Sequence, residues 1–308
     1  MIKNSPYIIE SYTSKQLTSN IDEISKEIAE EFRSIYANGD GKHSNGFGQF
    51  IFYPSEGRAI APCEIMENIK YNDFVELSSL DNFPLENYYR KDLNEYPLFW
   101  HDPEETLKAF REKFSHDAYI SIIRNTVTKK ITGCTFGKDC SLDEAFRNEE
   151  WENPYRYSKL RNHQHYRDIS LFIDTIKNTL LENRENFKNI FNHLGRDEIS
   201  AFTQVHVWNN LFVSEEIRSR KQGNLLREML HRYFSLIPEE KTQYLFHIGE
   251  SQKYNFDGSL SKAYTIFKNA GAIDAIGFLS DHDPKPGEST LIVSSLKQMK
   301  NFFTQSEN

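Results

Sequence analysis

A basic turn that contains glycine is the segment of this sequence best suited to hold a ligand. An apolar run ends with Leu211, Phe212 and Val213, and a helical pattern begins at Leu225. Between them lies Arg218-Ser219-Arg220-Lys221-Gln222-Gly223-Asn224. A turn that opens a helix presents backbone N–H groups without helical partners, and the helix dipole adds positive charge there. The sequence therefore predicts that residues 211–213 and 218–225 bind an anionic group such as a pyrophosphate.

The run 205–213, expected as the strand before this turn, carries one titratable residue, His206. His206 has an unperturbed pKa of about 6.5, so its imidazole could accept a proton near neutral pH. Asn210 is a polar candidate on the same run. The alternative is that His206 is a strand histidine that only makes hydrogen bonds.

Two other groups of residues are of types that can bind a metal or act as a nucleophile. His163 and His165 with Cys140 lack the second ligand pair of a structural zinc site, so the sequence predicts no metal. Cys134 lies in an apolar run, where a cysteine behaves as a small buried hydrophobe more often than as a nucleophile.

The first half of the chain predicts a strand, two helices and a hairpin. Residues 7–12 alternate like a strand, and residues 18–36 place apolar side chains on one helical face. Asp102-Pro103 favours the start of a helix over residues 102–114. The apolar runs 119–123 and 131–137 flank a polar turn and indicate a hairpin.

The second half predicts helices alternating with strands. The expected elements are a helix over 225–236 stopped by Pro238, a buried strand over 244–248, a helix over 261–269 capped by Gly271, and a closing hairpin from 272–279 and 289–296.

The basic turn resembles the acyl-CoA-binding motif of the GCN5-related N-acetyltransferase (GNAT) superfamily, Val-x-Pro-Glu-Tyr-Arg-x-x-Gly-x-Gly/Ala. In one register Val213 takes the motif's Val, Glu216-Ile217-Arg218 falls on Glu-Tyr-Arg, and Gly223 on the second glycine, with Lys221 in place of the first. In the other register Arg220-Lys221-Gln222-Gly223 falls on Arg-x-x-Gly, with two extra residues after the strand and Leu225 at the last position. Both registers stay open.

The expected order of elements is also similar to that of the GNAT family. Ala263, Phe267, Lys268 and Gly271 resemble its pattern Ala-x-x-x-Tyr-x-x-x-Gly. The resemblance implies an α/β (α+β) fold with a central mixed sheet flanked by helices, as one GNAT-like domain over 1–308. It implies an acyl-CoA-binding half at 200–300 and leaves two long insertions, 38–100 on the substrate side and 139–199 with a helical pattern. These insertions either recognise the acceptor or are only packing subdomains.

The resemblance implies an acetyl-CoA-dependent N-acetyltransferase, with acetyl-CoA or another acyl-CoA as co-substrate. An amine of a protein or small molecule would attack the thioester carbonyl directly in a ternary complex. Phe267 stands where the family often has a tyrosine as general acid, so that role moves to Tyr264 or to water, and Phe267 would pack beside the thioester. The alternative is a catalytically silent GNAT-fold protein that binds CoA for regulation or interaction.

Composition narrows the class of protein. A net charge of −8 over 308 residues argues against a general nucleic-acid binder, which needs concentrated Lys and Arg. No apolar run approaches the roughly 18 residues of a membrane span, and the N-terminus lacks the apolar segment of a secretory signal. Three cysteines cannot all pair. These observations predict a cytoplasmic protein with reduced thiols; an exported bacterial effector is the alternative.

Overall fold

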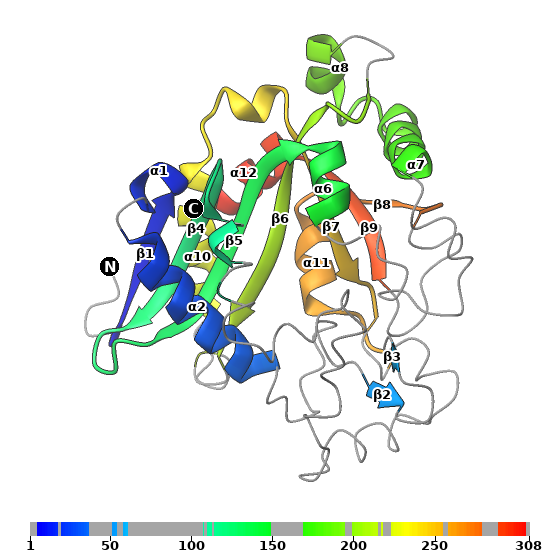
Figure 1. Ribbon diagram of the computed structural model, residues 1–308. Coiled ribbons are helices and arrows are strands. Elements are labelled where there is room, and N and C mark those ends of the chain that lie inside the picture. The colour runs from blue at the N-terminus through cyan, green and yellow to red at the C-terminus, as the bar shows by residue number, and fades with distance from the viewer. Residues whose placement is uncertain are drawn as a thin grey trace.

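A seven-stranded mixed sheet forms the centre of the protein in the computed structural model (Figure 1). The structure describes residues 5–17, 20–36, 51–53, 58–60, 107, 110–112, 114–148, 169–194, 199–214, 217, 223–254, 258–278 and 289–305. The strands lie in the order β1, β4, β5, β6, β7, β9, β8. Their bounds are β1 Tyr7–Thr13, β4 Ala118–Asn125, β5 Ile131–Ser141, β6 Gln204–Val213, β7 Phe246–Gln252, β8 Ile273–Ala275 and β9 Ser289–Ser295.

One pair of neighbouring strands in this sheet, β6 and β7, is parallel, and the other pairs in the described sheet are antiparallel. Antiparallel strands can be joined by a hairpin, as β4 and β5 are, whereas parallel neighbours require a crossover, here supplied by helix α10 (Gly223–Leu236). The expected α/β fold with a mixed sheet is therefore confirmed.

The hairpin of β4 and β5 shows how local sequence sets the strands. The Asn125 side chain accepts hydrogen bonds from the backbone N–H groups of Val127 and Thr128, and Lys129 adopts a positive φ of 65°. Asparagine is common in turns because its side chain can accept hydrogen bonds from nearby backbone N–H groups in this way. The hairpin is confirmed, and both strands are longer than the sequence predicts.

Helices cover both faces of the sheet. On one face lie α1 (Ser14–Leu17), α2 (Ile21–Tyr36), α6 (Leu142–Asn148), α7 (Ile169–Glu182) and α8 (Lys188–Leu194). On that face Phe110 and Phe114, from the helical residues near 110, pack edge-on against Phe136 of β5. The opposite face carries α10, α11 (Lys262–Asn269) and α12 (Leu296–Thr304), whose apolar residues meet Tyr119 and Trp208 of the sheet. The sheet is therefore buried between two helical layers.

Within the described residues, the predicted helices and strands are present with shifted ends; of the helix expected over 102–114, residues 107, 110–112 and 114 are described and are helical. Residues 18–36 correspond to α2, 225–236 to α10 and 261–269 to α11, in which Ser261 is the N-cap. The strand expected at 244–248 begins at Phe246, because Tyr244 still belongs to the turn after the short 3₁₀ helix η4 (Lys241–Gln243). Helix α12 was not predicted, although Ser295 caps it and Leu296, Met299 and Phe303 are its buried residues.

The structure describes only a small part of the expected insertion 38–100 and a larger part of the expected insertion 139–199. Within 38–100 it describes a two-stranded sheet of β2 (Ile51–Tyr53) and β3 (Arg58–Ile60), and the rest lies outside the described residues. The segment 139–199 carries α6, α7 and α8, as its helical pattern predicts. Its first three residues still belong to β5, where Asp139 pairs with His206.

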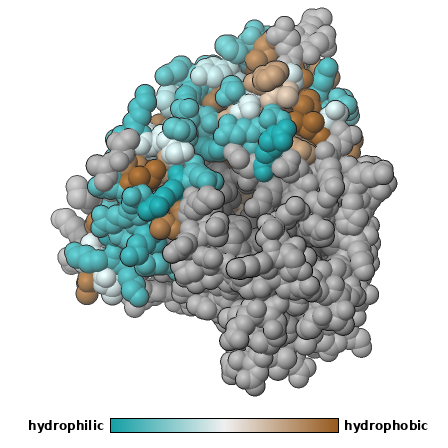
Figure 2. All heavy atoms as spheres, viewed as in Figure 1, coloured by the Kyte–Doolittle hydropathy of each residue, from teal (hydrophilic) through white to brown (hydrophobic). Residues whose placement is uncertain are grey.

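No helix among the described residues is long and apolar enough to cross a membrane. On the described surface in Figure 2, hydrophobic residues lie in small separate groups among hydrophilic ones.

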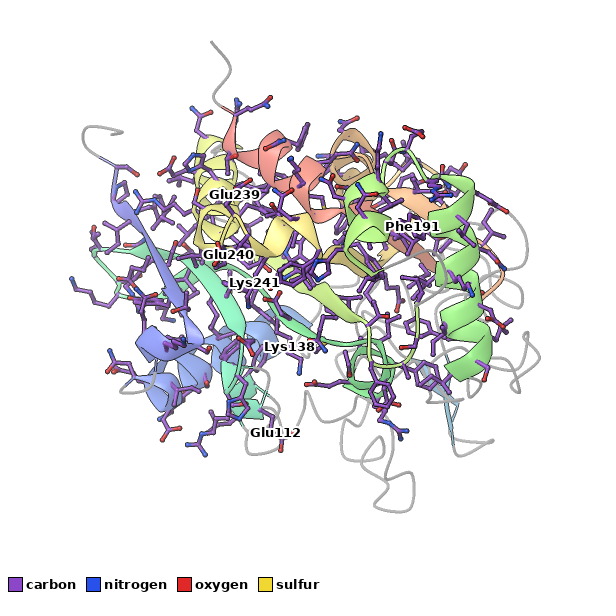
Figure 3. All side chains as sticks on the ribbon, turned by 90° about the horizontal axis from the view of Figure 1, so that it is seen from above. Glu112, Lys138, Phe191, Glu239, Glu240 and Lys241 are labelled. Atoms are coloured by element: carbon purple, nitrogen blue, oxygen red, sulfur yellow. The ribbon has the colours of Figure 1, made fainter. Side chains whose placement is uncertain are left out.

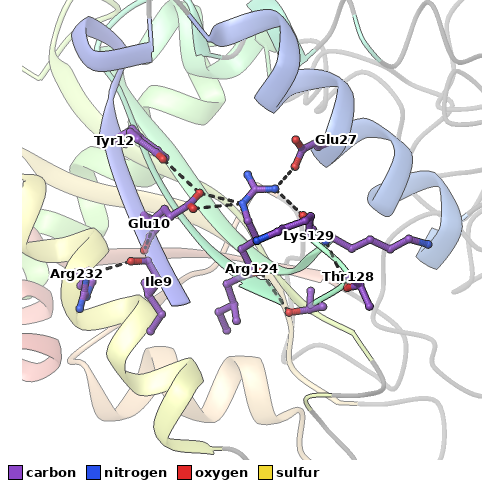
Figure 4. A network of polar contacts seen from close by, with 12 residues as sticks. Ile9, Glu10, Tyr12, Glu27, Arg124, Thr128, Lys129 and Arg232 are labelled. Atoms are coloured by element: carbon purple, nitrogen blue, oxygen red, sulfur yellow. Dashed lines mark hydrogen bonds and ion pairs between the residues drawn. The ribbon is translucent and has the colours of Figure 1, made fainter. Parts of the chain in front are cut away.

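An ion-pair network ties the first strand to its neighbours (Figure 4). Arg124 of β4 bonds Glu10 of β1 at 3.2 Å through Nε, and Glu27 of α2 and the Lys129 carbonyl through Nη1. Glu10 also accepts a hydrogen bond from Tyr12. Arg124 thus joins two strands, one helix and the hairpin turn through a single side chain.

We expect Arg124→Met to lower the free energy of unfolding by about 1–2 kcal/mol, because two half-buried carboxylates lose their cation. The exposed Arg147, paired with Asp143 one turn away on α6, is the matched control. Arg147→Met should cost less than about 0.5 kcal/mol. Urea denaturation of both variants measures the difference, and equal losses would contradict a structural role for Arg124.

Candidate functional site

The most unusual feature of the sheet is the divergence of β6 and β7. These strands pair over three residues only, Val205↔Phe246, His206↔His247 and Val207↔Ile248. Beyond this point β6 stays paired with β5, and β7 stays paired with β9. Figure 1 shows β6 running down to one side and β7 and β9 to the other. The sheet therefore separates at the carboxyl ends of its parallel strands.

A β-bulge lies where the divergence begins. Phe136 of β5 pairs with Asn210 and Gly137 pairs with Trp208, so Asn209 is an extra residue on β6. Bulges bend a strand and change the direction of its groups, and they are common beside active sites. Asn210 lies next to the bulge, as a strand residue whose side chain is not described.

The structure describes the predicted anion-binding residues in part, at the end of β6 and at the start of α10. Leu211 and Val213 are half-buried on β6, and Phe212 pairs with Cys134 across the sheet. Gly223 is the first residue of α10, Asn224 is exposed and Leu225 is buried. The basic part of the turn, Arg218, Ser219, Arg220, Lys221 and Gln222, lies outside the described residues. The structure thus places the start of a 14-residue helix after the end of β6.

A buried polar cluster, the Asp139 cluster, lies at the other end of β6. It consists of Tyr119, Asp139, His206, Tyr233 and Lys241. Asp139 Oδ1 lies 2.8 Å from His206 Nδ1, and Asp139 Oδ2 accepts hydrogen bonds from Tyr119 at 2.9 Å and Lys241 at 2.6 Å. His206 Nε2 lies 2.9 Å from the Tyr233 hydroxyl. Strands β4, β5 and β6, helix α10 and the turn before β7 are thereby joined.

The charges of this cluster follow from its contacts. Burial alone would raise the pKa of Asp139, but the hydrogen bonds and charges of His206 and Lys241 outweigh burial and hold its pKa below the usual value. Burial raises the pKa of Tyr233 well above its usual value, so its hydroxyl keeps its proton. The ionised Asp139 can only accept, so the His206 Nδ1–H donates to it.

His206 lies on β6 as predicted, but its ring has 0% exposure and both nitrogens have partners. A proton could reach Nε2 only through Tyr233, which is itself fully buried. The cluster meets the surface at Lys241, whose side chain is 22% exposed and lies 3.6 Å from Asp117. Figure 3 shows Glu239, Glu240 and Lys241 in succession above this end of the sheet.

Tyr264 and Phe267, the residues considered for the general acid position, both lie on α11. The Tyr264 hydroxyl donates to the Asp274 carboxylate at 2.8 Å, and the residue is buried. Phe267 stacks on His247 of β7, with ring centroids 5.7 Å apart and planes 3° apart, and meets Trp208 edge-on at 4.8 Å. Phe267 thus lies beside the last paired residues of β6 and β7.

The remaining candidates from the sequence are two cysteines and two histidines. Burial raises the pKa of the Cys134 thiol well above its usual value, which keeps it protonated, as in the buried-hydrophobe interpretation. Cys140 is buried as well, while His163 and His165 lie outside the described residues. Across the part of the chain that the structure describes, no group of three or more His, Cys, Asp or Glu side chains could hold a metal ion.

Several polar residues of this region were not singled out from the sequence: Tyr119, Asp139, Tyr233, Lys241 and His247. No local sequence pattern marks Tyr119, Tyr233 or Lys241, and Asp139 is the first residue of the insertion predicted over 139–199. His247 did carry a signal, because it is the one polar residue within the apolar run 244–248. A polar side chain in an otherwise buried strand demands a reason.

The chain was compared with protein-family models and with curated proteins, and neither comparison found a match.

Proposed function

We propose that this protein is an acyl-CoA-dependent N-acyltransferase of the GNAT type, with acetyl-CoA as the simplest acyl donor. The observation that supports this most is the divergence of β6 and β7 at their carboxyl ends, with α10 beginning after β6. In open α/β sheets, ligands bind outside the carboxyl ends of parallel strands at such points.

The start of α10 suits the pyrophosphate of CoA. Its first backbone N–H groups and the helix dipole favour an anion, and the basic residues Arg218, Arg220 and Lys221 precede them in the sequence. The region where β6 and β7 diverge would then bind the pantetheine arm of CoA, which carries the acyl group. A bulge at Asn209 in the strand along this strip is a further feature expected beside a reaction centre.

The order of elements along the chain adds support. The GNAT-like series of strand, two helices, two or three strands, helix, strand, helix and strand pair can be laid over β1, α2 with the helical residues near 110, β4 with β5 and β6, α10, β7, α11 and β8 with β9. Helices α1, α6 to α8 and α12 and the described strands β2 and β3 lie outside this series.

The proposed reaction is attack of an acceptor amine on the thioester carbonyl, with release of CoA thiol. The amine belongs to a protein or a small molecule. Backbone N–H groups of β6 at the bulge would stabilise the developing oxyanion. His206 stays a predicted base, acting through Tyr233 because the acceptor cannot touch its buried ring. With Tyr264 bonded to Asp274, water is the simpler proton source for the leaving thiolate.

Gly223→Glu tests the cofactor. We expect acetyl-CoA to bind the wild-type protein at micromolar strength and to raise its melting temperature, since a ligand that binds only the native state stabilises it. The new carboxylate would stand beside the pyrophosphate and should weaken binding at least about tenfold by charge repulsion. Isothermal titration calorimetry measures both affinities.

Ser235→Glu is the matched control, because it adds the same charge at an exposed position near the opposite end of α10, about 18 Å along the helix. It should leave acetyl-CoA affinity within about twofold. Unchanged affinity in Gly223→Glu, or absence of binding to the wild type, would remove the proposed cofactor site.

The second candidate function is a catalytically silent protein that binds CoA. It is favoured by the complete burial of His206 and by the bond between Tyr264 and Asp274, which engage both side chains within the fold. Incubation with acetyl-CoA, amine acceptors and a thiol reagent separates the two, because transfer or hydrolysis releases free CoA thiol whereas silent binding does not.

A further inference from the structure

His247 of β7 is a buried polar residue whose bonding is incomplete. Its side chain has 0% exposure. Nδ1 lies 3.1 Å from the backbone carbonyl oxygen of His206, and Nε2 has no hydrogen-bond partner among the described residues. A buried polar atom without a partner is rare in native proteins and requires an explanation, such as a functional role.

The protonation state of His247 follows from its neighbours. A carbonyl oxygen can only accept, so Nδ1 carries the proton. Burial and the nearby His206 lower the pKa of His247 to about 3, against a smaller opposing effect of the carbonyl bond, so the ring is neutral at physiological pH. Nε2 therefore presents a lone pair, and what it lacks is a hydrogen-bond donor.

The position of Nε2 coincides with the point where the sheet separates. His247 belongs to the middle one of the three pairs of β6 and β7, and Gly249 is the first β7 residue beyond them. A Cβ on Gly249 would lie 3.1 Å from Nε2 and 3.8 Å from the Trp208 carbonyl oxygen, so the imidazole edge lies over Gly249. The ring thus leans along β7 toward the divergence, and Phe267 holds its plane by stacking.

A second unsatisfied group lies across the strand pair. Ser294 of β9 is directly opposite His247, is fully buried, and its hydroxyl also has no partner among the described residues. Side chains of directly paired antiparallel residues lie on the same face, close together. Two buried polar groups without partners therefore lie side by side, as expected of a site that receives a polar ligand.

The start of α10 lies at the end of β6 that is away from His247, because Leu225 of α10 and Val213 of β6 pack in one apolar cluster. From Trp208 to Val213, β6 advances five residues, or about 17 Å at about 3.3 Å per residue. If the start of α10 holds the pyrophosphate, the thiol end of CoA is the part that extends toward His247.

We propose that Nε2 of His247 accepts a hydrogen bond from the pantetheine arm of CoA, from its thiol or from an amide N–H, where β6 and β7 diverge. This inference rests on the proposed acyl-CoA-binding function, and it identifies the side chain that forms a hydrogen bond with the pantetheine arm. His247 is thereby a positioning residue for the thiol end of the ligand.

The test is calorimetric titration of wild-type protein, His247→Phe and His247→Gln with CoA and with acetyl-CoA. Phenylalanine keeps the stack on Phe267 and removes the lone pair, whereas glutamine keeps an acceptor oxygen near Nε2. We expect His247→Phe to weaken CoA binding about five- to tenfold, and His247→Gln to recover most of it. The melting temperature of ligand-free His247→Phe should fall, because the substitution also removes the Nδ1–H that bonds the His206 carbonyl oxygen, so all titrations are run well below the melting temperature of each variant. The exposed His193, stacked on Tyr244, supplies the control His193→Phe, with unchanged affinity.

The two ligands separate the donors. Acetyl-CoA has no S–H, so a loss confined to CoA supports the thiol as donor, and equal losses for both ligands support an amide N–H. Wild-type affinity for both ligands in His247→Phe overturns the inference while leaving the proposed function intact. Absence of CoA binding to the wild-type protein overturns both.

Discussion

Asp139→Ala is expected to lower the free energy of unfolding by about 3–5 kcal/mol, the usual cost of removing one member of a buried ion pair. The Asp139 side chain is 7% exposed and is the common acceptor of His206, Tyr119 and Lys241. Without it, His206 Nδ1–H and the Tyr119 hydroxyl lose their acceptor within the protein. Urea denaturation at neutral pH measures the loss.

The pH dependence of this effect has a definite sign. The folded-state pKa of Asp139 is lowered, so its contribution is fully present above the unfolded pKa of about 4 and disappears as the pH falls through the lower folded value. The gap in stability between wild type and Asp139→Ala should therefore be widest near neutral pH and should narrow below about pH 4.

Asp143→Ala is the control for Asp139→Ala. Asp143 is a carboxylate on the adjacent helix α6, in an exposed pair with Arg147, and its loss should cost about 0.5 kcal/mol or less. If the protein cannot be recovered as Asp139→Ala, Asp139→Asn serves, because one amide oxygen can satisfy only part of the three donors. A cost for Asp139 no larger than for Asp143 would show that the cluster does not stabilise the fold.

Gly137→Ala should destabilise the protein by about 3 kcal/mol or more, at the upper end of the cost of overpacking. A Cβ at this position would lie 2.3 Å from the Tyr233 hydroxyl and 2.4 Å from the Val207 carbonyl oxygen. The second contact is with backbone in the middle of the sheet, which cannot move without breaking the pairing of β5 and β6. Calorimetric melting and urea denaturation measure the loss.

Gly133→Ala on the same strand is the matched comparison. Its Cβ would meet side-chain atoms of Val213 and Ile123, at 2.9 and 3.0 Å, which can shift. We expect about 1–2 kcal/mol there. Similar costs at the two glycines would mean that Tyr233 and β6 rearrange freely, and would weaken the view of the Asp139 cluster as a rigid unit.

The local sequence determined most of the elements of this protein. Apolar periodicity placed α2, α10 and α11, and Asn125 with its polar neighbours placed the hairpin of β4 and β5, because turns and amphipathic faces depend on residues close in sequence. The ends of the elements were predicted less accurately than their positions. Helix α12 was not predicted, because its first residue, Leu296, continues the apolar run of β9.

The composition of the candidate site was decided only by tertiary structure. Asp139 and His206 are 67 residues apart in sequence, and Lys241 is 102 residues from Asp139. His247 can be seen as odd in the sequence, but its missing partner and its place at the divergence follow from the register of β6, β7 and β9. Strand register and the burial of charges depend on contacts between distant segments, which short-range sequence patterns do not encode.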